Sequence, residues 1–195
     1  TGAGSLQWAA EALGETPAEI GELIAPAAEG VAADEGLFFL PYLIGERSPR
    51  WDAHASGVLA GLRMHHRRPH LTRAVLEGVG YSLALCMAPL RRPGDGAIDV
   101  IGGGAASDTW LALLADIWGV PVRRRSVTTQ ANSLGAAVTG MVGLGLAGFD
   151  LASRLSTVTA EFVPGEASVR HQRHLARFSD AYRSLRGWFA DERRG

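Results

Sequence analysis

The spacing of apolar and polar residues predicts a chain that alternates between helices and short strands. Apolar residues recur at the helical period in the segments 5–13, 70–90, 107–118, 131–146, 150–156 and 166–190. Short continuous apolar runs, which are typical of buried strands, lie at 37–40, 58–62 and 98–101. This alternation predicts a layered α/β fold.

Turn and capping residues place several boundaries between these elements. Ser5 is a suitable N-cap for the first helix, and a second helix is predicted to open at Thr16 ahead of a proline. Residues 41–52 contain two prolines and a glycine, and we interpret them as a loop. A strand is predicted at 120–123, and we expect it at a sheet edge because Pro121 has no N–H to donate.

Three consecutive glycines separate the predicted strand 98–101 from the helix 107–118. Glycine has no Cβ, so its backbone can approach a ligand closely. The first turn of the following helix offers unpaired N–H groups and a positive dipole end, which suit phosphate. We therefore predict a nucleotide-binding turn, with a plain strand-to-helix turn as the alternative. The candidate binding residues are Gly102, Gly103, Gly104, Ser107 and Asp108.

A dinucleotide site is the competing interpretation of the same turn. The stretch 102–107 lacks the final glycine of the G-x-G-x-x-G fingerprint. Three arginines at 123–125 nevertheless follow about 20 residues later, where an NADP site places basic residues for the 2′-phosphate. An NADP-binding oxidoreductase domain is therefore an alternative hypothesis. A solvated strand end is the simplest interpretation of the arginines.

Composition narrows the function classes. The chain has 195 residues, 47% hydrophobic and 20% charged, which is typical of a globular domain or a large lobe. The net charge of -1 gives no general attraction to nucleic acid or to membranes. All 19 basic residues are arginine, and the absence of lysine excludes both a Walker A loop and Schiff-base chemistry. No apolar run reaches the roughly 18 residues that a membrane span needs.

The cysteine and the histidines do not predict a disulfide or a metal site. The single Cys86 excludes an internal disulfide, and we expect it to be a small buried hydrophobe in a cytoplasmic protein. His65, His66 and His70 lie close in sequence without a neighbouring acidic or cysteine cluster, so we predict no metal site. His171 and the nearby His174 are expected at the surface or partly buried. Because the chain lacks an initiator Met, we expect it to begin in mid-protein or to have been processed.

Several motifs resemble the C-terminal half of the FGGY family of carbohydrate kinases. The family's second signature is matched over residues 57–77, with a seven-residue gap between its halves. Further matches are Leu40-Pro41-Tyr42-Leu43, Gly45-Glu46-Arg47, the glycine turn, Ala115-Asp116 and Leu134-Gly135-Ala136-Ala137. The loop 45–52, with Trp51, is most similar to the gluconokinase branch of the family. The xylulokinase branch is the second most similar. Ala55-Ser56-Gly57 departs from the usual Ala-Arg-Gly.

The resemblance implies a ribonuclease H-like lobe of the actin-like ATPase superfamily, with a mixed sheet flanked by helices. Residues 1–195 would form the C-terminal nucleotide-binding lobe, and ATP with Mg²⁺ would bind in a cleft against a missing N-terminal lobe. Gly103 and Gly104 would lie near the α-phosphate and adenosine, and Asp108 near the ribose and base. Glu46 and Arg47 would lie on a loop facing the cleft. Arg47 would contact phosphate or assist closure, or else form an internal ion pair with Glu46 or Asp52.

The same resemblance assigns the catalytic base to the missing lobe, so no catalytic residue is expected in this chain. The expected substrate is a small sugar or sugar acid, gluconate first and then xylulose. We expect the chain alone to be inactive, and to self-associate through the face that an isolated lobe exposes. A non-catalytic, kinase-derived sugar sensor is a further alternative.

Overall fold

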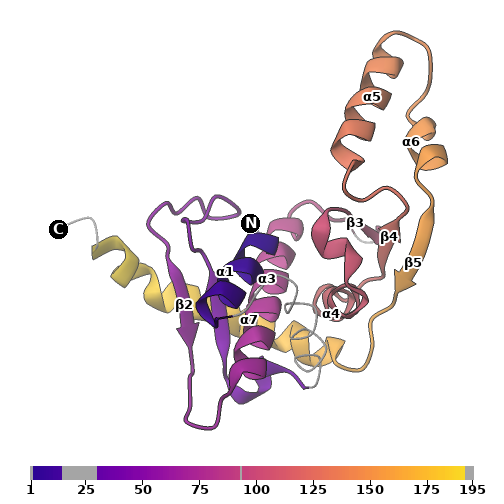
Figure 1. The fold of residues 1–195 in the computed structure, drawn as a ribbon. Coiled ribbons are helices and arrows are strands. Elements are labelled where there is room, and N and C mark those ends of the chain that lie inside the picture. The colour runs from indigo at the N-terminus through magenta and orange to yellow at the C-terminus, as the bar shows by residue number, and fades with distance from the viewer. Residues whose placement is uncertain (1, 15–29, 93, 192–195) are drawn as a thin grey trace.

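The computed structural model describes residues 2–14, 30–92 and 94–191. A central group of helices lies between two small sheets (Figure 1). The helices are α1 (Gly2–Ala12), α3 (Arg68–Met87), α4 (Asp108–Trp118), α5 (Ala131–Gly143), α6 (Asp150–Leu155) and α7 (Ser168–Asp191), with 3-10 turns η1 (Ala32–Glu35) and η2 (Gly103–Ala106). The strands are β1 (Phe38–Pro41), β2 (Gly57–Ala60), β3 (Ile98–Val100), β4 (Val122–Arg125) and β5 (Val158–Phe162).

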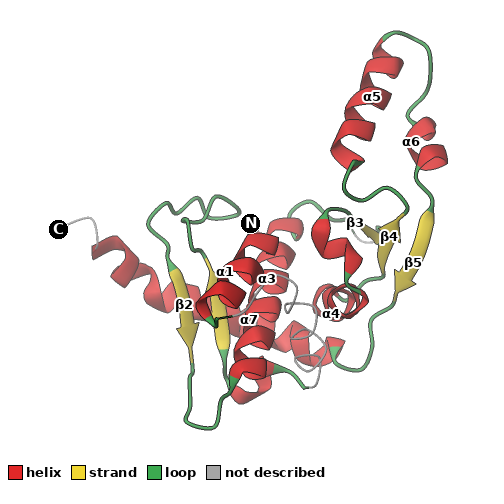
Figure 2. Ribbon diagram, viewed as in Figure 1, coloured by secondary structure: helices red, strands yellow, loops and turns green. Residues whose placement is uncertain are grey.

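The strands form one antiparallel pair and one mixed sheet. β1 and β2 pair antiparallel, with Phe38 opposite Ala60. In the second sheet β3 and β4 are parallel, whereas β4 and β5 are antiparallel. Helices and mixed strands therefore confirm the predicted α/β class (Figure 2).

The prediction that the strand after Pro121 lies at a sheet edge is wrong. β4 is the central strand of its sheet, between β3 and β5. The strand begins at Val122, so the missing N–H of Pro121 lies outside the ladder, while the Pro121 carbonyl accepts the N–H of Ile98 at 2.8 Å. The neighbour on the other side, β5, occupies residues 158–162, where no strand was predicted.

The core forms where α3 packs against β1 and α4. A Cβ built on Gly78 in α3 would lie 2.0 Å from the carbonyl oxygen of Phe39 in β1, so the two backbones meet where only glycine fits. α3 begins two residues earlier than predicted, because the His70 ring accepts the Arg67 N–H at its start, 3.0 Å from Nδ1. It ends at Met87.

The buried carboxylate of Glu77 ties α3 to η1. Its two oxygens accept the backbone N–H groups of Ala32 at 3.0 Å and Ala33 at 3.1 Å. The same carboxylate pairs with the Arg73 guanidinium at 2.7 Å. Burial raises the pKa of Glu77, and the Arg73 charge opposes that rise. The acidic position that closes the 57–77 motif therefore organises a distant turn.

Two expectations concern the N-terminal helices. Ser5 is buried inside α1 and does not cap it, because the helix already begins at Gly2. The helix predicted to open at Thr16 lies outside the described residues. Within the described ranges, no helix has the length and apolarity of a membrane span.

α5 and α6 form an arm that rises away from the rest of the molecule (Figure 1). Within α5 the buried residue is Val138, and most of the small-residue run 133–137 is exposed. A Cβ on Gly135 or Gly140 would meet no atom within 4 Å. Within the described part of the chain, these glycines of α5 are therefore not packed against another element.

Candidate nucleotide-binding site

The glycine turn joins β3 to α4 through the short 3-10 turn η2. Gly102 has a φ of 89°, a backbone conformation that favours glycine. Its N–H donates to the Thr128 carbonyl at 3.2 Å, and its own carbonyl accepts the N–H of Ala105 at 3.1 Å. The turn is thereby held against the segment that leads into α5.

Gly103 and Gly104 have open space where a side chain would stand. A Cβ on either residue would meet no atom within 4 Å, and neither residue has a positive φ. Neither packing nor backbone conformation therefore requires glycine at these two positions. An approaching ligand does explain them, because it would reach the backbone without a Cβ in its way.

Ser107 and Asp108 form the start of α4. The Ser107 hydroxyl accepts the N–H of Trp110 at 3.2 Å, so Ser107 is the N-cap of this helix. Asp108 is the first residue of the helix, where a negative side chain is favoured by the helix dipole. Two of the candidate residues thus organise the helix end that faces the turn.

The carboxylate of Asp108 is neutralised by an arginine that the sequence did not connect to it. Arg124 Nη1 lies 2.6 Å from Asp108 Oδ1. Water screens this pair, since 69% of the Asp108 side chain is exposed, so it contributes little to folding stability. Its consequence is electrostatic: a positive charge lies beside a carboxylate that would otherwise repel phosphate.

The neighbouring arginines, Arg123 and Arg125, also form ion pairs. Arg123 Nε donates to Asp99 Oδ1 at 2.8 Å, and Arg125 Nε donates to Asp99 Oδ2 at 3.1 Å. All three arginines of the run 123–125 are therefore paired with carboxylates. This pairing removes the observation that favoured an NADP 2′-phosphate site.

Glu46 and Arg47 have different environments on the loop 41–56. Glu46 is buried, and its carboxylate accepts the backbone N–H of Arg50 at 3.0 Å. Its main chain also exchanges hydrogen bonds of 2.7 Å with Asp52. Arg47 is exposed and, within the described residues, has no ion pair with Glu46 or Asp52. The internal ion-pair interpretation is therefore wrong for Arg47, and no hydrogen bond or ion pair between described residues joins this loop to the glycine turn.

Arg47 lines a pocket of about 280 Å³ between this loop and α3. Cys86 lines the same pocket and is partly exposed, with its Sγ 3.1 Å from the Ser48 carbonyl. The expectation of a buried Cys86 is wrong, because the residue lies near the end of α3, where the helix faces the loop instead of the core.

The tertiary structure brings an acidic residue to the histidines at 65 and 66. Glu35 Oε2 lies 2.8 Å from His65 Nε2 and 3.2 Å from His66 Nε2, a spacing compatible with metal ligands. The His66 Nδ1 accepts the backbone N–H of Arg63 at 3.0 Å, so the proton of the neutral ring lies on Nε2. Metal-binding histidines donate from the second nitrogen, so hydrogen bonding to Glu35 fits this group better than a metal does.

The two C-terminal histidines are buried, contrary to expectation. His171 has 0% exposure, and its Nδ1 lies 2.7 Å from the Tyr81 hydroxyl. His174 Nε2 lies 2.6 Å from Asp34 Oδ1. Both rings face the core side of α7, a placement that their polarity alone did not indicate.

Comparison with known proteins agrees with this arrangement. The model of the FGGY family of carbohydrate kinases, C-terminal domain, matches residues 3–144. Xylulose kinase of Staphylococcus epidermidis is 38% identical over 143 residues, 72% of this chain and 28% of that protein. Gluconokinase of Bacillus licheniformis is 35% identical over 161 residues, 80% of this chain and 30% of that protein.

A solved structure shares the fold. Ligand-bound xylulose kinase from Lactobacillus acidophilus aligns with a TM-score of 0.84 and 28% identity, over 96% of this chain and 39% of that one. The likeness confirms the predicted ribonuclease H-like fold of the actin-like ATPase superfamily. The chain spans well under half the length of each of these relatives.

Proposed function

Because the chain belongs to the FGGY family of carbohydrate kinases, we propose that it is the ATP-holding C-terminal domain of a sugar or sugar-acid kinase. Kinases of this family transfer a phosphoryl group from ATP. The observation that carries the proposal is the open glycine turn. The second and third glycines of the turn, Gly103 and Gly104, are required neither by packing nor by backbone conformation.

We place the nucleotide against this turn, at the start of α4. Gly103 and Gly104 would face the α-phosphate and adenosine, where the unpaired N–H groups of the helix start attract negative charge. The pair formed by Asp108 and Arg124 would lie towards the ribose and base. Mg²⁺ would enter on the nucleotide and lower the repulsion between its phosphates and the acceptor.

The remaining catalytic parts belong, in this proposal, to an N-terminal lobe. Asp108, at the start of α4, is paired with Arg124, and Asp99, in the strand before the turn, is paired with Arg123 and Arg125, so neither carboxylate is proposed as the base. The α5–α6 arm supports a second lobe, because it exposes apolar side chains of a kind that an interaction face covers. Arg47 would meet phosphate or assist closure from the loop across the cleft.

Gluconate is the acceptor that we propose first, and xylulose second. The loop 45–52, with Trp51, supports this order, and both a gluconokinase and a xylulose kinase are among the relatives. A cytoplasmic setting follows from this function, since ATP and sugar substrates are available there.

The glycine turn is tested by calorimetric titration of the 195-residue chain with ADP. We expect Gly104→Val to weaken ADP binding at least about tenfold with an unchanged melting temperature, because its side chain occupies open space that the nucleotide needs. Gly96→Val is the matched control, since a Cβ there also meets nothing within 4 Å but lies away from the turn. Unchanged ADP affinity in Gly104→Val would place the site elsewhere. Tight NADPH binding without ADP binding would favour the oxidoreductase alternative.

Turnover tests the assignment of the catalytic base to another lobe. With ATP, Mg²⁺ and either gluconate or xylulose, the pure chain is expected to produce no phosphorylated sugar above a no-protein control. Product formation by the pure chain would show that the base lies within these residues.

A further inference from the structure

A second pocket, of about 590 Å³, lies where the loop 50–52 meets α7. Its principal lining residues are Arg50, Trp51, Asp52, Tyr182, Arg183 and Arg186. We name it the arginine pocket. No part of the proposed nucleotide site contributes to it, since the glycine turn and α4 are absent from its lining.

Aromatic and hydrogen-bond contacts surround Arg50 at the floor of the arginine pocket. The Arg50 guanidinium lies 4.3 Å from the centre of the Tyr182 ring, and its Nη1 donates to the Tyr42 hydroxyl at 3.0 Å. Tyr42 and Tyr182 pack edge to face at 5.7 Å. Arg50 therefore presents a positive charge in one fixed orientation, which reduces the entropy that a ligand loses on binding.

The lining of the pocket carries three arginines and one carboxylate. Asp52 accepts the Tyr182 hydroxyl at 2.6 Å, and this hydrogen bond holds the pKa of Asp52 below its ordinary value. Arg183 pairs with Asp180 on its own helix. Arg186 has neither a hydrogen bond nor an ion pair to any residue that the structure describes. Because Arg186 is exposed, its guanidinium is open to an anionic ligand that enters the pocket.

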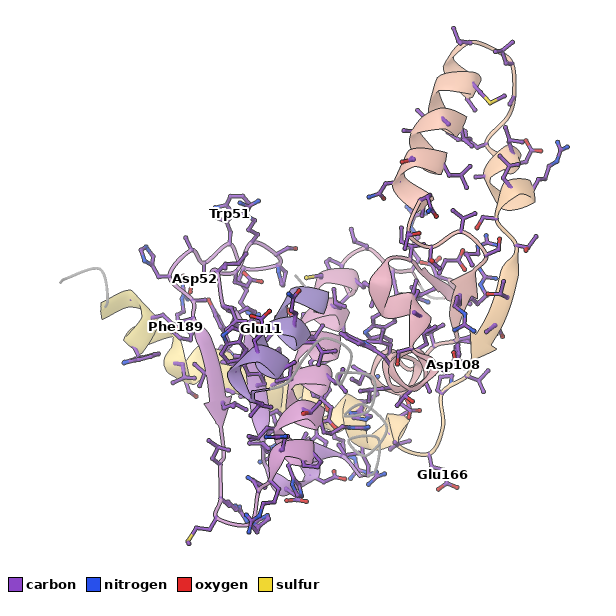
Figure 3. The ribbon with its side chains drawn as sticks, viewed as in Figure 1. Glu11, Trp51, Asp52, Asp108, Glu166 and Phe189 are labelled. Atoms are coloured by element: carbon purple, nitrogen blue, oxygen red, sulfur yellow. The ribbon has the colours of Figure 1, made fainter. Side chains whose placement is uncertain are left out.

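Trp51 forms an exposed apolar wall of the same pocket. Its side chain is 78% exposed, and its φ of 56° is in the left-handed region, which bulky residues rarely adopt. Figure 3 shows Trp51 at the outer end of the loop, with Asp52 beneath it and Phe189 of α7 beyond. The two backbone hydrogen bonds between Glu46 and Asp52 hold the turn in this conformation, which keeps the indole at the surface, where a ligand can reach it.

We propose that the arginine pocket binds a small polyhydroxylated oxyanion, either a sugar carboxylate or a sugar phosphate. Its charged group would pair with Arg186 and Arg50, and the C–H face of its carbon skeleton would lie on the Trp51 indole. The polyhydroxylated part of the ligand rests on the proposed carbohydrate kinase function. The anionic part rests on the arginines alone.

The test is titration of the 195-residue chain with gluconate, 6-phosphogluconate and inorganic phosphate. Calorimetry and tryptophan fluorescence monitor binding. Removing one charge-assisted contact by Arg186→Gln is expected to weaken binding about tenfold. Trp51→Asn should weaken the two sugar probes but not inorganic phosphate, because asparagine tolerates the left-handed backbone and removes only the ring. Arg154→Gln, on α6, is the control and should bind as the unmodified chain does.

The probes identify the ligand class. Preference for gluconate indicates a sugar carboxylate, and preference for 6-phosphogluconate a sugar phosphate. The proposal fails if no probe binds at millimolar concentration, or if Arg186→Gln and Trp51→Asn bind as the control does. ADP titrated into the same samples separates the two proposals. ADP binding without oxyanion binding contradicts only the arginine pocket, and the reverse result contradicts only the nucleotide site.

Discussion

Burial determines what His171 contributes to this molecule. The ring has no exposed surface, and burial followed by the charge of Arg73 lowers its pKa to about 3. Its Nδ1 meets the Tyr81 hydroxyl, while Nε2 has no partner among the described residues. A protonated ring would hold a buried N–H with nothing to accept it, so folding requires neutral His171.

This burial predicts an acid-sensitive fold. The folded-state pKa of His171 lies below the ordinary value of 6.5, so between those values the unfolded chain binds more protons. Stability should therefore fall as the pH drops below about 6.5, by up to about 1.4 kcal/mol per pH unit from this residue. Urea denaturation midpoints measured at intervals between pH 7 and pH 5 should decrease as this stability is lost. His171→Phe should flatten this dependence.

The control is His54→Phe, which removes an exposed histidine ring. It shows whether the change in pH dependence comes from the burial of His171 or from the loss of a histidine in general. Equal pH dependence in the unmodified chain and in His171→Phe would contradict the assignment. The range above pH 5 is chosen because most carboxylates keep their charge there.

At the scale of the element, two helices use glycine for opposite reasons. In α3, Gly78 permits contact with β1, where a Cβ would lie 2.0 Å from the Phe39 carbonyl oxygen. In α5, Gly140 faces open space. The same residue type is therefore required by packing in one helix and left unexplained by packing in the other.

Alanine substitutions are expected to separate these two cases. Gly78→Ala should destabilise the chain by about 1–3 kcal/mol, because the backbone of β1 must move. Gly140→Ala should stabilise it by about 0.5–1 kcal/mol, because alanine forms helix more readily and meets no atom. Chemical denaturation of both variants beside the unmodified chain measures the difference. A destabilised Gly140→Ala would mean that α5 is packed more tightly than the structure shows.

At the scale of the whole molecule, the α5–α6 arm carries apolar surface that this chain does not cover. The exposed side chains on and around the arm are Met141, Leu144, Leu146, Phe149 and Leu155. Several exposed apolar side chains on one arm are typical of an interaction face. In the proposed kinase that face belongs to the contact between lobes.

Self-association of the isolated chain follows from this exposure. We expect sedimentation velocity at micromolar to millimolar concentration to show dimers or larger species, and Phe149→Asp to weaken their formation at least about tenfold. The substituted side chain is 68% exposed, so the fold should be retained. Val169→Asp, at 65% exposure on α7, controls for added negative charge. A strictly monomeric unmodified chain would contradict this use of the arm.

Much of the local structure was predictable because it depends on neighbouring residues. Helical spacing located α3 and α4 to within a few residues, and the three glycines located the turn between β3 and α4. These features depend on backbone conformation and on contacts three or four residues apart. The same local reasoning misplaced β4, because its position in the sheet depends on β5, about thirty residues further on.

The sequence by itself determined the alternation of elements, the glycine turn and the motifs that resemble the kinase family. Only the tertiary structure decided which polar side chains meet: Arg124 with Asp108 across 16 residues, His65 with Glu35 across 30, and Tyr182 with Asp52 across 130. Side-chain pairing over such separations depends on how whole elements pack, and residue spacing does not encode it. The arginine pocket was therefore invisible in the sequence, although its Trp51 and Arg50 were already part of the loop that resembled the family.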